Sequence, residues 1–162
     1  NLYTLGYNGN KNLTTLNIAT KTNLSTYLEQ FRMLTDAINI KDAFVINFGL
    51  EFEITVFKSY SNSETLIECI NELREYFSID KWQINQPIIL SEVRNLIGGV
   101  KGVQTVEDVR LENKSGTALG YSQYKYGFKQ ATKNGVIYPS MDPSIFELKY
   151  PNTDINGRVT TY

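Results

Sequence analysis

The stretch Phe44–Val56 reads FVINFGLEFEITV, and its apolar side chains occupy every second position. Such alternation is typical of a β-strand with one buried face and one polar face. We therefore predict a strand over about residues 43–57. Because this run exceeds the usual strand length, a bend or bulge is expected near Gly49. One polar face favours an antiparallel sheet with helices packed on the other face, so the expected fold class is α+β.

Two amphipathic helices are predicted to cover the apolar face of this strand. The first spans about residues 24–38 and the second about residues 64–77, where Ser61 and Glu64 have the spacing of a capping box. Both segments place apolar residues three and four positions apart, which forms one stripe along a helix. The residues of the first stripe are Leu24, Tyr27, Leu28, Phe31, Leu34 and Ile38, and those of the second are Leu66, Ile70, Leu73 and Phe77.

A third helix and a second strand complete the predicted core. Pro87 suits the first turn of a short helix, and a pair of glycines ends that helix about ten residues later. Residues 103–111 read as a strand, and the loss of alternation between Val106 and Val109 indicates a bulge. We expect this strand to be the antiparallel neighbour of the strand over residues 43–57.

The chain is expected to consist of three parts. Residues 1–23 form an N-terminal strand and turn segment, residues 24–112 form the α+β core, and residues 113–162 form an extended C-terminal arm. After residue 113 the sequence contains loop residues, two X-Pro steps within five residues and only one short strand, from Ile145 to Tyr150. A segment of this kind has too few apolar residues to form its own core.

The composition offers little material for catalysis. The 162 residues include one cysteine and no histidine, with sixteen basic and seventeen acidic side chains and a net charge of −1. These counts exclude a disulfide framework, a histidine-dependent nucleophile and a His-ligated zinc site. The near-neutral charge gives no support for nucleic-acid binding, and no apolar run reaches the length of a membrane span. We expect no catalytic residues, no cofactor and no metal.

For three short motifs we prefer an ordinary structural explanation to a functional one. Glu51 and Glu53 lie about 7 Å apart on one strand face, which is the ordinary position of solvated carboxylates. Cys69 lacks a cationic neighbour that would activate its thiol, so we interpret it as a small buried residue that packs in the core. The glycine-rich residues 98–102 follow a helix, whereas a phosphate loop follows a strand.

The candidate site lies in the C-terminal arm, where tyrosines alternate with basic residues. Such a pattern can stack single-stranded nucleic acid, but it is also enriched at protein interfaces, which the neutral net charge favours. Proline-stiffened turns lower the entropy lost when such a segment docks. The predicted interface residues are Tyr121, Tyr124, Tyr126, Tyr138, Met141, Ile145 and Phe146.

The order of these segments resembles the C-terminal portion of a known family. Thr26–Ile38 reads TYLEQFRMLTDAI, and it is followed by FVINFGLEFEITVF, WQINQPIILSEV and GVKGVQTVEDVRL. The end of the chain reads YPSMDPSIFELKYPNTDINGRV. These stretches resemble the baseplate wedge proteins of contractile-tailed, T-even-like bacteriophages, in the baseplate J-like family, over roughly residues 2–158.

The resemblance implies a structural role without catalysis. Proteins of this family form the ring around the tail hub, so the implied partners are other wedge subunits and a second copy. No nucleic acid, membrane or small-molecule substrate is implied. The implied location is the tail baseplate of the virion, assembled in the host cytoplasm. Because family members are several times longer, residues upstream of Asn1 are also expected. The alternative is an α+β module that binds a small molecule or nucleic acid.

Overall fold

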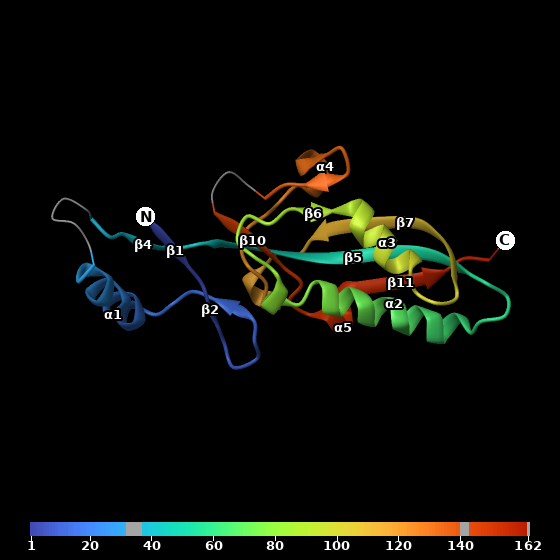
Figure 1. Ribbon diagram of the computed structural model, residues 1–162, viewed down its shortest axis with the longest axis horizontal. Helices are drawn as coiled ribbons and strands as arrows, with labels where there is room; N and C mark the ends of the chain where they lie inside the picture. The colour runs from blue at the N-terminus through green and yellow to red at the C-terminus, as the bar shows by residue number, and fades with distance from the viewer. Residues whose placement is uncertain (32–36, 140–142, 162) are drawn as a thin grey trace.

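Strand β5 (Phe44–Val56) is the central strand of the main sheet and pairs with three other strands (Figure 1). The computed structural model describes residues 1–31, 37–139 and 143–161. Strand β7 (Val103–Asn113) runs antiparallel to β5. Strands β10 (Ser144–Glu147) and β11 (Ile155–Val159) run parallel to successive parts of β5. The fold class is α+β as predicted, but the sheet is mixed and not wholly antiparallel.

The alternation in β5 has the register that the sequence predicted. Phe52 and Ile54 are buried, whereas Glu51 before them is exposed and Glu53 between them is half-buried. The polar face is nevertheless covered at its other end, because Asn47 and Gly49 are buried. A Cβ atom at Gly49 would lie 2.7 Å from Lys114 Cε and 3.2 Å from the carbonyl oxygen of Asp154, so a larger residue would have to displace the lysine side chain and shift this backbone slightly.

The two sequence-based expectations about bulges have different outcomes. The ladder between β5 and β7 is regular from Phe48 to Glu53, so the irregularity predicted near Gly49 is absent there. The bulge predicted in the second strand is confirmed. Glu53 pairs with Asp108 and Ile54 pairs with Val106, which leaves one extra residue in β7 between them. An unmatched residue of this kind increases the local twist of the sheet.

Helices α2 (Asn62–Tyr76) and α3 (Leu90–Gly98) pack on the apolar face, α2 against β11 and α3 against β7. The predicted cap of α2 is present, since the hydroxyl of Ser61 accepts a hydrogen bond from the backbone N–H of Glu64. Helix α3 begins later than predicted, because the residues after Pro87 form strand β6 (Ile88–Ile89). Both stripes are centred on buried residues, which are Cys69 and Leu73 in α2 and Val93 and Ile97 in α3.

Helix α1 (Ile18–Glu29) contradicts the prediction of a core helix over residues 24–38. It begins six residues earlier, after the N-cap Asn17, and contains no fully buried residue. Figure 1 shows it at one end of the molecule, away from the main sheet. An apolar stripe indicates that a helix has a face to bury, but it does not identify the surface that covers it. Leu34 of the predicted stripe lies outside the described residues.

The remaining N-terminal strands connect α1 to the body. Strand β1 (Leu2–Thr4) pairs in parallel with β4 (Ile40–Asp42), which continues into β5. Strands β2 (Gly6–Tyr7) and β3 (Leu13–Thr14) form a short antiparallel hairpin. We call β1, residues 17–31 with α1, and β4 together the α1 lobe. The salt bridge between Lys21 and Asp42, at 2.7 Å, ties the helix of this lobe to its strand.

The C-terminal residues do not form the extended arm that was predicted. Strands β10 and β11 belong to the main sheet, joined by the one-turn helix α5 (Pro151–Asp154). Strands β8 (Thr132–Lys133) and β9 (Val136–Ile137) lie between β7 and β10 in the sequence. They form a smaller sheet with β6, in the order β6-β9-β8. Helix α4 (Phe128–Ala131) precedes it, and the 3₁₀ turns are η1 (Ile79–Lys81) and η2 (Thr117–Leu119). The core therefore extends beyond residue 112, because the long strand β5 needs partners along its whole length.

Candidate functional site

The predicted interface residues separate into buried and accessible ones. Ile145 and Phe146 retain exposed fractions of 4% and 1%, so these two predicted anchors are core residues of their own chain and are not available to a partner. Their position in β10, against β5, is the physical reason. Tyr124 and Tyr138 remain exposed. Met141 lies outside the described residues.

Two of the tyrosines are held by contacts within the chain. The hydroxyl of Tyr121 donates to the carboxylate of Asp154 at 2.8 Å, and that of Tyr126 donates to the carbonyl oxygen of Tyr138. The ring of Tyr126 also lies edge-on to Phe128 and Phe146, at centroid distances of 5.2 and 5.5 Å. Burial raises the pKa of Tyr121 to about 12, with a further contribution from Asp154. These rings therefore contribute to the fold, and only their outer edges face solvent.

A buried polar cluster that the sequence did not reveal joins four parts of the chain. The carboxylate of Glu147 accepts hydrogen bonds from the backbone N–H of Leu13 at 2.6 Å and from Asn47 Nδ2 at 2.9 Å. The side-chain oxygen of Asn47 accepts the N–H of Ser122 at 2.7 Å. Burial raises the pKa of Glu147, and both hydrogen bonds oppose that rise. A buried carboxylate so completely bonded fixes the N-terminal hairpin on the sheet.

The carboxylate pair on β5 lies on the open face of the sheet, where ion pairs surround it. Arg158 of β11 forms an ion pair with Glu53, and Arg110 Nη2 of β7 lies 3.6 Å from the same carboxylate. Asp108 in turn binds Arg110 Nε at 2.9 Å. Glu53 therefore belongs to an ion-pair network on this face, as expected of a structural surface carboxylate.

The other two motifs lie where the sequence analysis placed them. Cys69 is fully buried in α2, and burial raises the pKa of its thiol to about 11. The glycine-rich segment ends α3 at the C-cap Gly99 and then turns into β7, with Gly102 at φ 101°. Among the described ranges, no group of three or more metal-ligating side chains occurs. No helix in those ranges has the length and apolar character to cross a membrane.

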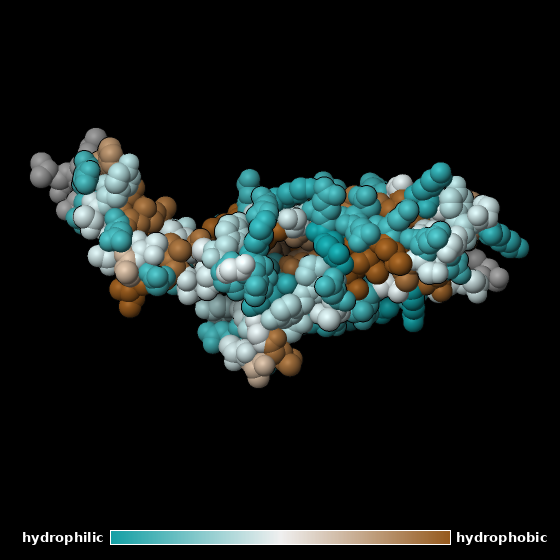
Figure 2. Space-filling model, turned by 90° about the horizontal axis from the view of Figure 1, so that it is seen from below, coloured by the Kyte–Doolittle hydropathy of each residue, from teal (hydrophilic) through white to brown (hydrophobic). Residues whose placement is uncertain are grey.

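Three strongly exposed apolar side chains lie on the α1 lobe. Ile18, Phe31 and Tyr27 retain exposed fractions of 83%, 71% and 59%. The rings of Tyr27 and Phe31 lie one helical turn apart and contact each other at a centroid distance of 5.3 Å. Figure 2 shows apolar surface on this lobe, at the left of the molecule. The sequence identified Tyr27 and Phe31 as part of a stripe but assigned that stripe to the core, and it did not single out Ile18.

Comparison with known proteins leaves the family open. No family model and no curated protein sequence matches this chain.

Proposed function

We propose that this chain is a structural subunit of a larger assembly and that the α1 lobe is a surface through which it docks to a neighbour. The observation that carries the proposal is a twelve-residue helix in which no residue is fully buried, although Leu24 and Leu28 on one face are half-buried. Isolated helices of this length are marginal in water, so most helices depend on packing of their apolar face. Large apolar side chains that remain exposed together, as the contacting rings of Tyr27 and Phe31 do, are typical of an interaction site.

The resemblance to phage baseplate wedge proteins gives this role a specific setting. Part of the stretch that carries the resemblance, from Thr26 onward, belongs to α1 itself. In this setting the chain belongs to a tail baseplate, and its partners are other wedge subunits and a second copy. The proposed role is assembly without catalysis, which agrees with the ion-paired and buried state of the carboxylates and the thiol described above.

A paired substitution on the α1 lobe tests the proposal. We expect the double variant Ile18→Ser, Phe31→Ser to fold normally, because both side chains are exposed and such changes alter stability by about 0.5 kcal/mol or less. The same variant is expected to fail to enter assembled baseplates, since it replaces two strongly exposed apolar side chains of the lobe by polar ones. The measurement is the amount of the chain that sediments with contractile-tail baseplates, together with their completeness by electron microscopy.

The control variant is Ile67→Ser, which changes a side chain that is 57% exposed on α2, outside the lobe. It should enter baseplates like the wild type. Normal incorporation of the double variant would show that the α1 lobe is not a docking surface. Absence of the wild-type chain from baseplates would refute the phage setting and leave the docking proposal to be tested by self-association of the purified chain.

A further inference from the structure

A second surface has a chemistry different from that of the α1 lobe. Residues 125–139, which we call the basic protrusion, contain α4 and the β8–β9 hairpin and stand out from the body in Figure 1. The hairpin turns at Asn134 and Gly135, which have φ of 52° and 76°. Positive φ at both central residues is the geometry of a two-residue hairpin turn. The protrusion is therefore an ordered element.

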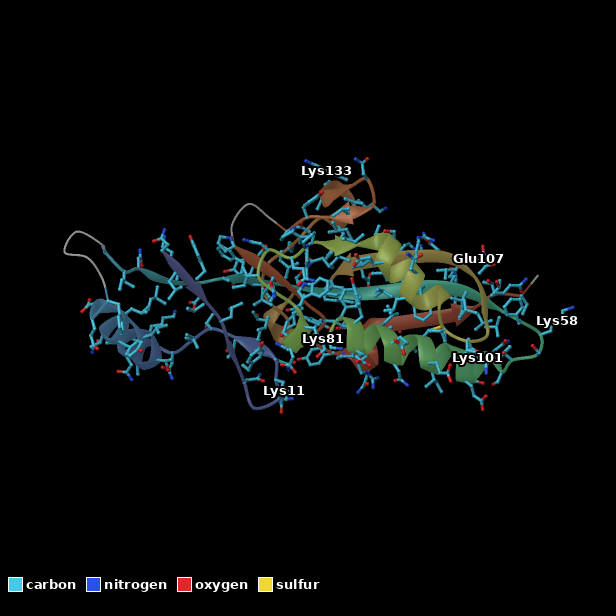
Figure 3. The ribbon with its side chains drawn as sticks, viewed as in Figure 1. Lys11, Lys58, Lys81, Lys101, Glu107 and Lys133 are labelled. Atoms are coloured by element: carbon cyan, nitrogen blue, oxygen red, sulfur yellow. The ribbon has the colours of Figure 1, made fainter. Side chains whose placement is uncertain are left out.

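Positive charge gathers on this protrusion without compensation. Between residues 113 and 139 the sequence contains four lysines and no aspartate or glutamate, although the whole chain has a net charge of −1. Lys125, Lys129 and Lys133 are exposed, and within the described ranges none of them forms an ion pair. Figure 3 shows Lys133 at the outer end of the protrusion.

Lys133 borders a largely apolar groove of about 670 Å³ on the same element, together with the polar side chains of Gln130 and Asn134. Its lining includes the rings of Tyr126 and Tyr138 and the side chains of Ala131, Val136 and Pro139. The hydrogen bond from Tyr126 to the backbone of Tyr138 holds the two walls together. Because these walls are already ordered, a ligand would lose little free energy in shaping the site.

We propose that the basic protrusion binds an acidic protein segment that places an apolar side chain in this groove. Unpaired lysines around an apolar floor complement carboxylates around an apolar anchor. Single-stranded nucleic acid fits less well, because it needs successive exposed rings for stacking. Here Tyr126 is packed against Phe128 and Phe146, and Tyr124 packs edge-on against Phe44 at 4.7 Å, so Tyr138 is the accessible ring in the groove.

The test measures fluorescence anisotropy of a labelled polyglutamate peptide with a central pair of leucines, titrated with the full chain. The variant is the triple substitution Lys125→Gln, Lys129→Gln, Lys133→Gln. Each exposed ion pair contributes a factor of about two in affinity, so we expect the triple variant to bind roughly tenfold more weakly. The matched control is Lys58→Gln, Lys101→Gln, two exposed lysines that lie at the far end of the molecule in Figure 3.

Four outcomes bear on the proposal. The proposal is supported if the triple variant binds the peptide more weakly, if added salt weakens binding, and if replacing the leucines of the peptide by serines weakens binding. Equal binding by the triple variant overturns it, as does equal binding of a peptide with glutamines in place of the glutamates. An oligothymidylate of matched length that binds more tightly than the peptide would assign the surface to nucleic acid instead. The double variant of the α1 lobe should bind the peptide normally, so this test and that of the proposed function can fail separately.

Discussion

Gly157 allows β11 to lie against the helix layer, and an alanine at this position is expected to destabilise the fold. Gly157 pairs directly with Phe52 of β5. A Cβ atom at residue 157 would lie 2.3 Å from Phe52 Cζ and 2.7 Å from Leu66 Cδ1 of α2. Real Cβ contacts do not come so close, so at least one neighbour must move. Phe52 is 2% exposed, so a movement of its ring disturbs its buried neighbours.

Overpacking of a buried site costs about 1–3 kcal/mol, and a domain of this size loses about 2–4 °C of melting temperature for each kcal/mol. The assay is urea unfolding followed by fluorescence of Trp82, which is buried beside Phe77 at 5.3 Å. The control is Gly98→Ala at the end of α3, where the nearest atom, Val106 Cγ2, lies at an ordinary 3.7 Å. That variant should be neutral or stabilised by up to about 1 kcal/mol. A Gly157→Ala variant within 0.5 kcal/mol of the wild type, at about the precision of such measurements, would refute this packing argument.

Two further predictions concern buried groups. Because burial raises the pKa of Glu147, the folded state binds more protons than the unfolded state, so this group lowers stability as pH rises from about 4.3 through its folded pKa. Urea unfolding across this pH range measures how the free energy of unfolding changes with pH. Glu147→Gln should remove the part of that change that Glu147 causes, whereas the exposed control Glu51→Gln should retain it. An unchanged pH dependence in Glu147→Gln would contradict the assignment. The Cys69 thiol should react with a disulfide reagent only after unfolding, since it is buried and its pKa is raised to about 11. Labelling of the native protein at the rate of the unfolded protein would show that α2 opens readily.

The parts of the fold that were predicted correctly rest on local patterns. Alternation identified β5 and its buried face, and the phase change between Val106 and Val109 identified the bulge in β7. The cap at Ser61 and the stripe of α2 were equally local signals. An antiparallel neighbour of similar length is the simplest partner for an alternating strand, which is why the pairing of β5 with β7 could be predicted.

The errors come from interactions between distant segments. Nothing near Ile145 or Phe146 indicates that β10 pairs in parallel with a strand 100 residues earlier. Bulky apolar side chains after a proline turn suit an interface anchor and a buried strand equally, so the sequence could not distinguish these. The sequence Asn134-Gly135 is a strong local signal for a hairpin turn, and the β8–β9 hairpin of the basic protrusion turns at these two residues.

The candidate contact surfaces also depend on contacts between distant segments, which the sequence does not reveal. The stripe of α1 was visible in the sequence, but its exposure depends on the absence of a covering element within the described chain. The cluster of Glu147 and Asn47 had no local signature at all, because its two side chains come from strands far apart in the sequence.

The central position of β5 also determines the order in which the protein can fold. Its parallel partners follow it by 100 residues in β10 and 105 in β11, so the contacts of the sheet have a high mean sequence separation. Such topologies fold slowly, because the entropy of closing long loops must be overcome before strand pairing stabilises the chain. During synthesis, β5 and its row of phenylalanines emerge long before β11 is made. The growing chain therefore passes through a stage in which an apolar strand has one unpaired edge, and any truncation before residue 144 leaves it in that aggregation-prone state.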